Sequence, residues 1–385
     1  MRPNPMHKPL QVLIIEDSES DAILILSLLR RGGYDPQFQR VATAAELSAA
    51  LKQQPWDVVL ADHCMPGFNS IEALGMVKAL DPDLPFIIVS GVIGDDLAVA
   101  AMKAGAQDYL MKSNLARLVV AVERELIEAA DRRARREAEQ ALLAQREELR
   151  IARDVQQRLF PENPPVVAGC DLAGSSIAAA ATGGDYFDFI PDAAGGLYVV
   201  EGDVTGHGLG PALLMADVRA YLRALLLSGR SLAEILAQAR HLLQADLGGD
   251  QFITLFLGRL DPPRRAWEYL SAGHPAGYVL GAEGGVKAEL AASTSALGID
   301  ETRPSPVPRR LELEPGDLVL LMTDGVAEAR SGTNEEFGEE RALDMVRRER
   351  ARPAADIVQR LLEAVRNHAG PDNVQDDMTA IVIKL

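Results

Sequence analysis

The sequence has few cysteines, no excess of positive charge and no long apolar run. Only Cys64 and Cys170 occur among 385 residues. This leaves no disulfide framework and is typical of the reducing cytoplasm, where we expect the protein to work. The net charge of −17 argues against a general nucleic-acid or anionic-membrane binder. We find no signal peptide and no apolar run of membrane-spanning length, and therefore expect neither a membrane nor a nucleic-acid partner.

What the sequence does contain is the composition of an ordinary globular protein, with 48% hydrophobic and 25% charged residues. A length of 385 residues suggests two or three domains. From changes of pattern we expect a flexible N-terminus over 1–9, an α/β domain over 10–120, a helical connector over 121–160 and an α+β domain over 161–385. The expected fold class is therefore multidomain.

In the first third, short apolar strands alternate with amphipathic helices, which predicts a doubly wound parallel sheet. Ligands of such sheets bind beyond the carboxyl ends of the strands. The polar residues that close or follow the predicted strands are Glu16, Asp17, Asp62, Ser90 and Lys112. Three acids, a hydroxyl and a lysine on one rim indicate a phosphoryl-transfer site.

This arrangement resembles the receiver domain of two-component response regulators, which has a CheY-like fold. The resemblance implies that Asp62 is the phosphoacceptor and that Glu16 and Asp17 hold one Mg²⁺ together with Asp62. It also implies a sensor histidine kinase or a phosphotransfer protein as the partner that phosphorylates Asp62.

The remaining receiver positions also have counterparts in this chain. By the same resemblance, Ser90 and Tyr109 are the switch residues, and Lys112 contacts the phosphate. Receivers commonly follow this lysine with proline, whereas this chain has Ser113. The substitution removes no charge from the predicted site.

The connector contains neither Gly nor Pro and is rich in Ala, Leu, Glu, Arg and Gln, which predicts a long helix. A heptad seam of alternating four- and three-residue spacing is formed by Ala138, Leu142, Gln145, Leu149, Ala152, Gln156 and Leu159. This seam predicts a weak coiled coil and a homodimer. The alternative is a single solvated helix with interleaved Arg and Glu pairs.

The last half combines short strands, Gly-rich turns and helices, which predicts an α+β domain, a sandwich of sheets covered by helices. Four acidic motifs flank its predicted strands: Gly183–Asp188, Gly202–Gly208, Thr323–Gly325 and Gln375–Thr379. Singly, each could be an ordinary turn. Together they predict clustered carboxylates, which repel unless a cation holds them. Oxygen ligands favour Mg²⁺ or Mn²⁺ over zinc, and two such ions would activate a water for attack on a phosphorus ester.

The four motifs, in this order, resemble the PPM-type serine/threonine phosphatases, specifically the bacterial branch related to SpoIIE. The segments 152–161 and 271–275 resemble that branch as well. The resemblance implies two Mg²⁺ or Mn²⁺ ions. The catalytic and metal-binding residues that it implies are Asp185, Asp203, the Val204 carbonyl, Asp324 and Asp376.

Three details of this site stay open in the sequence. Asp376 is preferred to Asp377 as the ligand because it stands first in the Asp-Asp-Met-Thr motif. His207 and His274 could act as general acids, although a lone histidine in a Gly-rich loop more often packs or donates a hydrogen bond. The choice between Mg²⁺ and Mn²⁺ is also open.

Together, the two resemblances imply a response regulator whose output is the dephosphorylation of a phosphoserine or phosphothreonine protein, such as an anti-sigma-factor antagonist in a partner-switching pathway. Phosphorylation of Asp62 would control this activity. The helices predicted over 210–247 are candidates for the switch element. The alternative is a non-catalytic sigma-factor-binding adaptor of the RssB type. Loss of the metal-site acids would favour the adaptor, and this chain keeps them.

Overall fold

The computed structural model describes residues 7–91, 95–193, 195–206, 208–249, 251–300, 306–370 and 373–385. It divides into two compact units, Met1–Ala144 and Gln145–Leu385, and each is described here by itself. None of the helices in the described residues is both long and apolar enough to cross a bilayer.

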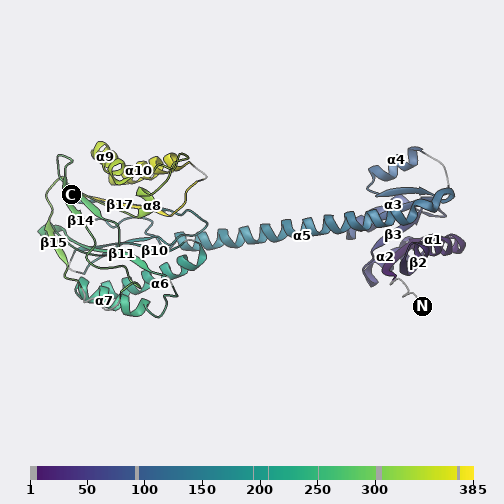
Figure 1. Cartoon of the computed structure of the whole chain (residues 1–385), viewed down its shortest axis with the longest axis horizontal. Coiled ribbons are helices and arrows are strands. Elements are labelled where there is room, and N and C mark those ends of the chain that lie inside the picture. Colours follow the sequence, from purple (N-terminus) through teal and green to yellow (C-terminus); the bar gives the residue numbers. More distant parts are fainter. Residues whose placement is uncertain are drawn as a thin grey trace. The chain divides into compact units, whose positions relative to one another are not determined.

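The first unit contains a five-stranded parallel sheet with the strand order β2-β1-β3-β6-β7 (Figure 1). Its strands are β1 (Lys8–Ile15), β2 (Tyr34–Val41), β3 (Val58–Asp62), β6 (Phe86–Ser90) and β7 (Asp108–Met111), and a short hairpin is formed by β4 (Cys64–Met65) and β5 (Phe68–Asn69). Strands β3 and β6 are buried along their whole length, as in a sheet with helices on both faces. The predicted doubly wound α/β class is confirmed.

Helices cover both faces of this sheet. Its helices are α1 (Glu19–Arg31), α2 (Ala44–Gln53), α3 (Ser70–Leu80), α4 (Asp95–Lys103) and the 3₁₀ helix η1 (Lys112–Arg117). One core joins α2, α3 and α4 to the sheet, and the other joins α1 and the start of helix α5 (Leu118–Gln157) to its opposite face. All parallel strands therefore end at the same edge, where the predicted phosphoryl-transfer residues lie.

Two features of this unit differ from what the sequence suggested. Strand β2 was not predicted, because an edge strand that bonds only to β1 tolerates Pro36 and alternates with exposed polar residues. Strand β1 begins at Lys8, so Lys8 and Pro9 belong to the sheet and not to the expected flexible N-terminus. The first six residues of that expected segment lie outside the described residues.

Helix α5 is one continuous helix of 40 residues, and its first turns are part of the receiver-like core. Leu118 and Val122 are fully buried against the sheet. Further along, Arg133 pairs with Asp81 at 2.8 Å, and Arg136 pairs with Asp83 at 2.7 Å. These contacts carry the packing of the first unit beyond the expected boundary at residue 120.

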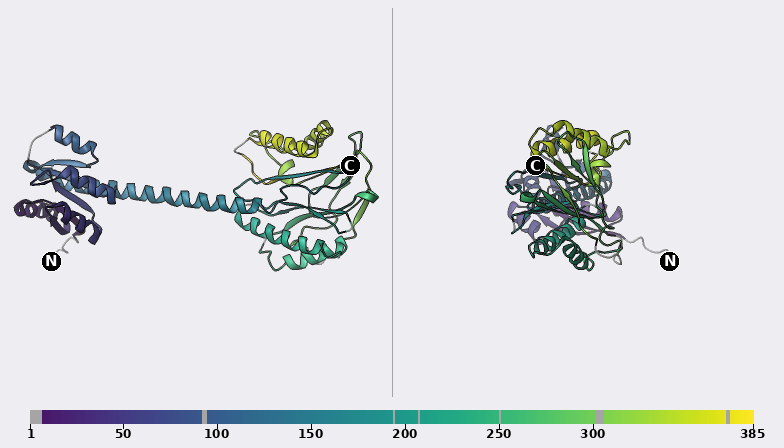
Figure 2. Two further views of the ribbon diagram at one scale, coloured as in Figure 1. Left: turned by 180° about the vertical axis from the view of Figure 1, so that it is seen from behind. Right: turned by 90° about the vertical axis from the view of Figure 1, so that its left-hand side faces the viewer.

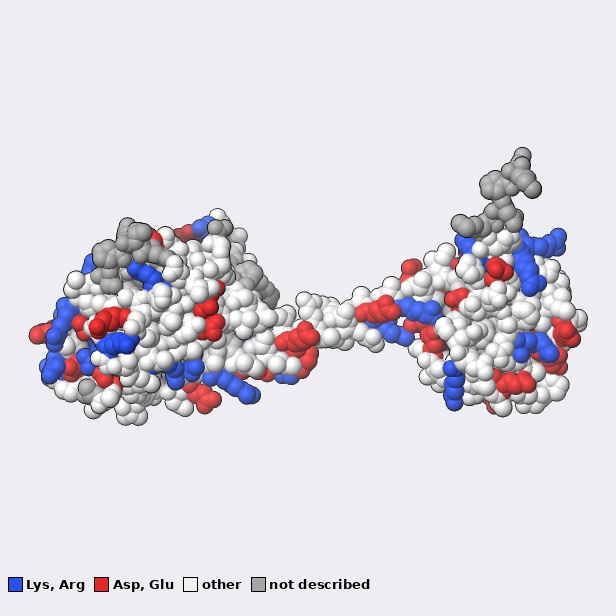
Figure 3. All heavy atoms as spheres, turned by 90° about the horizontal axis from the view of Figure 1, so that it is seen from below, with Lys and Arg blue, Asp and Glu red and all other residues white. Residues whose placement is uncertain are grey.

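The middle of α5 is exposed, and its end is not. Leu142 and Leu149 are 48% and 38% exposed, and acidic and basic side chains lie along the exposed helix on either side of an uncharged stretch (Figure 3). The last two positions of the predicted seam are wrong, because Gln156 is buried against Gly183 and Leu159 packs on the core of the second unit. Only the seam from Ala138 to Ala152 can meet another helix.

The second unit contains two antiparallel sheets of five strands each, with the orders β15-β12-β11-β10-β9 and β14-β13-β16-β17-β8. The first sheet consists of β9 (Tyr186–Pro191), β10 (Leu197–Val204), β11 (Ile253–Asp261), β12 (Ala266–Ala272) and β15 (Arg309–Glu312). The second consists of β8 (Asp171–Ile177), β13 (Gly277–Leu280), β14 (Val286–Leu290), β16 (Leu318–Met322) and β17 (Met378–Lys384).

Helices cover the outer faces of both sheets, so this unit has four layers (Figure 2). Helices α6 (Leu209–Leu226) and α7 (Leu232–Leu243) pack on the first sheet, and α9 (Glu339–Glu349) and α10 (Ala354–Ala369) pack on the second. A separate core of aromatic and aliphatic side chains fills the space between the sheets. The predicted α+β sandwich is confirmed. One element that we did not predict, α8 (Asp324–Ala327), begins at a candidate ligand.

Candidate functional site

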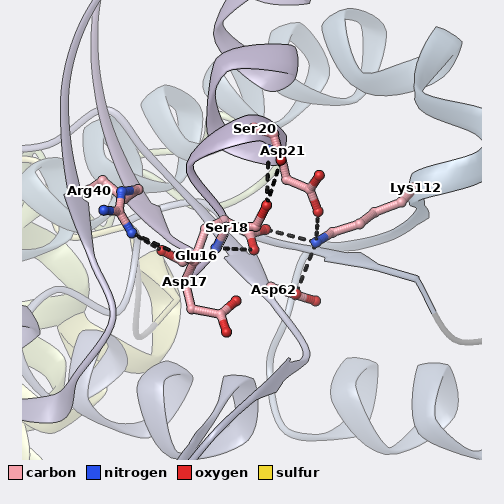
Figure 4. Close-up of polar contacts among 8 residues, drawn as sticks. All are labelled: Glu16, Asp17, Ser18, Ser20, Asp21, Arg40, Asp62 and Lys112. Atoms are coloured by element: carbon pink, nitrogen blue, oxygen red, sulfur yellow. Dashed lines mark hydrogen bonds and ion pairs between the residues drawn. The ribbon is translucent and has the colours of Figure 1, made fainter.

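The first candidate site lies at the carboxyl edge of the parallel sheet (Figure 4). Asp62 is the last residue of β3, Glu16 follows β1, and Lys112 follows β7. The Lys112 ammonium donates to Glu16 Oε2 at 2.9 Å, to Asp62 Oδ2 at 2.9 Å and to Asp21 Oδ2 at 2.5 Å. The structure thus brings together residues that lie almost 100 positions apart in the sequence.

Glu16, Asp17 and Asp62 form a set of acids suited to a hard cation. Each offers an oxygen, and these oxygens lie within 4.8 Å of one another. Because Mg²⁺ binds oxygens at about 2.1 Å, opposite ligands lie about 4.2 Å apart, and a small movement of the side chains would complete such a site. Ser90 closes β6 beside the strand that carries Tyr109, which places the predicted switch residues on the two neighbouring strands.

The charge of this site is unbalanced, because four acids, Asp17 and the three that Lys112 contacts, are opposed among the described residues only by the Lys112 ammonium and the guanidinium of Arg40, which contacts backbone oxygens. Burial raises the pKa of Glu16 above its usual range, and hydrogen bonding to Lys112 only partly opposes it. Burial lowers the pKa of Lys112, but its bonds to Asp21, Glu16 and Asp62 outweigh burial and raise that pKa above its usual range. The lysine therefore stays charged, and a cation would be drawn to the remaining negative charge.

Sequence analysis missed two members of this site. Asp21 lies in the first turn of α1, whose N-cap is Ser18, so it does not close a strand as the predicted residues do. Arg40 lies on the unpredicted strand β2 and donates to the backbone oxygens of Glu16 at 2.9 Å and Asp17 at 3.2 Å. The available signal for Asp21 was Ser18, which is a favoured residue at a helix N-cap. A helix that begins shortly after β1 keeps the acids of its first turn near the end of that strand.

The second candidate site lies at one end of the sandwich, where the four acidic motifs meet. Asp203 lies in β10 next to its end, and Asp185 immediately precedes the neighbouring β9. Asp324 begins α8 after β16, and Asp376 precedes the adjacent β17. Strand pairing therefore brings one pair of acids from each sheet to the same end. The carboxylates of Asp324 and Asp376 lie close enough to Asp203 to raise its pKa.

Asp185 is held by two hydroxyl groups that sequence analysis did not single out. It is 2% exposed, and its Oδ2 accepts hydrogen bonds from Thr323 Oγ1 at 2.9 Å and Thr379 Oγ1 at 2.6 Å. The Thr379 N–H in turn donates to Thr323 Oγ1 at 3.0 Å. Thr323 directly precedes Asp324, whereas Thr379 follows Asp376 by three residues, so no common spacing marked the two threonines in the sequence.

Asp376 and Asp377 differ clearly in their surroundings. Asp377 is 2% exposed, and its two oxygens accept from the Ala179 N–H at 2.8 Å and the Gly184 N–H at 2.6 Å. Asp376 is exposed, and its Oδ1 accepts a hydrogen bond from the Asp377 N–H at 2.8 Å. Asp377 is therefore committed to the backbone, which favours Asp376 as the residue that reaches a metal.

The two glycines before Asp185 allow a very close approach of backbone. A Cβ atom on Gly183 would lie 2.3 Å from the Asp377 carboxylate, and one on Gly184 would lie 2.3 Å from the Val204 carbonyl oxygen. The Val204 N–H also donates to the Gly184 carbonyl at 3.3 Å. Only glycine at these positions lets the Val204 carbonyl, the predicted backbone ligand, lie beside the Asp185 loop.

Like charges dominate this second site. Burial, followed by the Asp324 and Asp376 carboxylates, raises the pKa of Asp203 from an ordinary 3.8 to about 7. Burial and the Asp203 charge also raise the pKa of Asp185 well above its usual range. Buried carboxylates that repel one another fit a site built for divalent cations, which would return each of them to the ionised form.

The raised pKa of Asp203 predicts how stability depends on pH without metal. Its stabilising contribution is present below about pH 4 and is lost as the pH rises through 7, because the unfolded chain releases this proton first. In chelator-treated protein we therefore expect Asp203→Asn to raise the melting temperature at pH 8 by about 2 °C or more, and by much less at pH 5. Calorimetry at both pH values tests this, and an equal change at both would contradict it.

His274 is a buried hydrogen-bonding residue. It is 3% exposed, its Nδ1 lies 2.9 Å from Thr254 Oγ1, and its Nε2 lies 3.1 Å from Glu201 Oε2. Both ring nitrogens therefore have protein partners, which supports packing beneath Asp203 and not proton donation to a substrate. The other candidate, His207, lies outside the described residues.

Comparison with protein families assigns each half of the chain separately. A family described as Stage II sporulation protein E (SpoIIE) matches residues 193–385. A family described as the response regulator receiver domain matches residues 12–123. The two matched segments contain both candidate sites, except for Asp185 and the glycines that precede it.

Similar proteins match the second half or most of the chain. Phosphoserine phosphatase RsbU of Bacillus subtilis is 26% identical over 240 residues, which cover 62% of this chain and 70% of RsbU. Protein IcfG of Synechocystis sp. is 24% identical over 361 residues, which cover 86% of this chain but only 52% of IcfG, so the chain spans about half of that relative. The solved RsbU and RsbW domains of Rv1364c from Mycobacterium tuberculosis are 29% identical, with a TM-score of 0.51, and the match covers 57% of this chain and 61% of that chain.

Proposed function

The chain belongs to the SpoIIE family, and from this premise we propose that it is a response regulator whose output is metal-dependent dephosphorylation of a phosphoserine or phosphothreonine protein. Its first unit is a receiver domain, and its second is a serine/threonine phosphatase domain of the SpoIIE type. The observation that carries the proposal is the gathering of Asp185, Asp203, Asp324 and Asp376 at one end of the sandwich, where Asp324 and Asp376 add to burial in raising the pKa of Asp203, and Asp203 adds to burial in raising the pKa of Asp185.

In the proposed mechanism, Asp203, the Val204 carbonyl, Asp324 and Asp376 would hold two Mg²⁺ or Mn²⁺ ions. When bound, the ions would polarise the phosphoryl oxygens and lower the pKa of the attacking water.

Three residues that are not proposed as metal ligands hold this arrangement in place. Thr323 and Thr379 fix the orientation of Asp185, which would reach the ions through water. Asp377 holds the Gly184 N–H and so fixes the loop before Asp185. Water supplies the nucleophile in this scheme, so the phosphatase domain needs neither a serine nor a cysteine nucleophile.

We propose that the receiver domain supplies the control. A histidine kinase or phosphotransfer protein would phosphorylate Asp62, with one Mg²⁺ held by Glu16, Asp17 and Asp62. Lys112 already contacts Asp62 and would contact the phosphate instead. Ser90 and Tyr109 would then change position and alter the surface of the domain.

The proposed substrate is a phosphoserine protein of the anti-sigma-factor antagonist class, in a cytoplasmic partner-switching pathway. Two names support this choice, because RsbU is a phosphoserine phosphatase and the structure of Rv1364c joins an RsbU domain to an RsbW domain. Dephosphorylation of such a substrate would free a sigma factor.

The function is tested with purified full-length protein, Mn²⁺ and a generic phosphomonoester, with and without beryllofluoride as a mimic of phosphorylated Asp62. Hydrolysis that requires the metal and changes with beryllofluoride would support a regulated phosphatase. If folded, metal-loaded protein shows no hydrolysis in either state, the proposal is wrong. The RssB-type adaptor would then be tested by sigma-factor binding.

We also propose that the exposed seam of α5 forms a homodimer. Leu142 and Leu149 are the leucines of this seam and are 48% and 38% exposed, so Leu142→Lys with Leu149→Lys should convert a dimer to a monomer in sedimentation equilibrium. Leu143→Lys is the matched control, because Leu143 is 63% exposed and lies off the seam. An unchanged mass in the double variant would rule out this coiled coil.

A further inference from the structure

The last turn of α5 is joined to the phosphatase site by a pair of reciprocal hydrogen bonds. Gln156 Nε2 donates to the Gly183 carbonyl at 2.6 Å, and the Gly183 N–H donates to Gln156 Oε1 at 3.1 Å. Gln156 is only 7% exposed. Its side-chain amide therefore pairs with both backbone groups of Gly183, as a neighbouring strand would.

Gly183 lies next to the residues that build the metal site. On its other side is the Asp377 carboxylate, which would collide with any Cβ at this position and which accepts from the Gly184 N–H. Gly184 in turn touches the Val204 carbonyl, and Asp185 comes next in the chain. Only the Gly183–Gly184 dipeptide therefore separates the connector helix from two proposed ligands.

Two further contacts attach the residues after Gln156 to the same region. The Leu159 carbonyl accepts from Arg219 Nε at 2.8 Å, and Arg219 belongs to α6, the helix that follows the Asp203 motif. The Phe160 ring stacks on Phe187 of β9 with their centres 5.4 Å apart. The end of the connector thus contacts the segments that follow both Asp185 and Asp203.

We propose that Gln156 is a positioning residue through which the connector helix sets the Asp185 loop and the Val204 carbonyl. The inference rests on the proposed function and names the contact through which the site is regulated. If α5 turns or shifts, the amide leaves Gly183, and two buried backbone groups lose their partners. A buried backbone group without a partner is strongly unfavourable, so the loop moves with the helix and the ligands move with the loop.

The chemistry of this contact requires glutamine. Its amide offers one donor and one acceptor at the same end, matching the carbonyl and N–H of Gly183. An ionised glutamate could accept from the N–H but would set a negative oxygen against the Gly183 carbonyl. Methionine has nearly the same length and volume but can form neither bond. Gln157, the next residue, is exposed.

The test compares Gln156→Met and Gln156→Glu with the matched control Gln157→Met, all in full-length protein. We expect both Gln156 variants to require about 10–100-fold more Mn²⁺ for half-maximal hydrolysis, which is typical when the support of a metal ligand is removed, and to lose the response to beryllofluoride. Gln157→Met should keep both values of the unmodified protein.

Two further readouts separate positioning from general damage. Hydrogen exchange should become faster in the segment around Gly183 and Gly184 in both Gln156 variants, while β10 and β17 keep their protection. Calorimetric Mn²⁺ titration should show weaker binding without reference to turnover. If either variant is folded and keeps Mn²⁺ affinity and the beryllofluoride response, the inference is wrong. If the unmodified protein does not hydrolyse phosphoesters, the proposed function fails instead.

Discussion

Replacing Asp203 by asparagine is expected to reduce Mn²⁺-dependent hydrolysis by about a thousandfold, the effect of losing a central electrostatic group in an active site. The negative charges of Asp324, Asp376 and Asp377 all raise the pKa of Asp203. Asp203 therefore lies at the centre of the negative charge that would hold the ions. Asparagine keeps the shape of the side chain but removes one charge and one acceptor oxygen.

The control is Asp356→Asn, which changes an exposed acid in the first turn of α10 and should leave hydrolysis unaltered. Misfolding can be separated from loss of the ligand, because metal-free Asp203→Asn protein should melt higher than the unmodified protein at pH 8. If the variant keeps more than about a tenth of the activity, the proposal that Asp203 holds the ions is wrong.

Replacing Asp62 by asparagine is expected to abolish phosphorylation of the receiver domain and the response to beryllofluoride, while hydrolysis without beryllofluoride continues. Asp62 is 8% exposed at the end of β3, with Lys112 at 2.9 Å, and an amide cannot form the acyl phosphate. Incubation with a small-molecule phosphodonor, followed by intact-mass measurement, should therefore give no phosphorylated species.

Asp35→Asn is the matched control, because Asp35 is an exposed acid near the start of the edge strand β2. It therefore lies at the opposite end of that strand from the carboxyl edge. The variant should accept phosphate at Asp62 as the unmodified protein does. Phosphorylation of the Asp62→Asn protein at an unchanged rate would mean that another residue is the acceptor.

Much of the fold could be predicted, because its strands are buried and its helices are amphipathic. The family matches confirm both resemblances. Edge elements were harder, as β2 and β14 show: each bonds to a single neighbour and carries polar residues on most of its exposed positions. For such strands, pairing outweighs the weak preference of the residues themselves.

The sites were predicted in proportion to how directly a motif reveals them. Acids at strand ends were placed correctly at two edges, since strand pairing alone brings them together. Asp21 and Thr323 act through side-chain contacts that depend on how one element lies against another, which no spacing in the sequence records. Gln156 was assigned to a dimer seam because its heptad position fits, although the buried Gly183 backbone competes for the same amide.

The hydrogen bonds of Asp185 also affect the sandwich as a whole. Asp185 precedes β9 of one sheet, whereas Thr323 directly follows β16 and Thr379 lies in β17 of the other sheet. The Asp185 carboxylate therefore links the two sheets by hydrogen bonds. Sliding of one sheet over the other would break these bonds and move Asp185. A change in how the two sheets pack would therefore reach the phosphatase site through Asp185, even where that change begins away from the metal ligands.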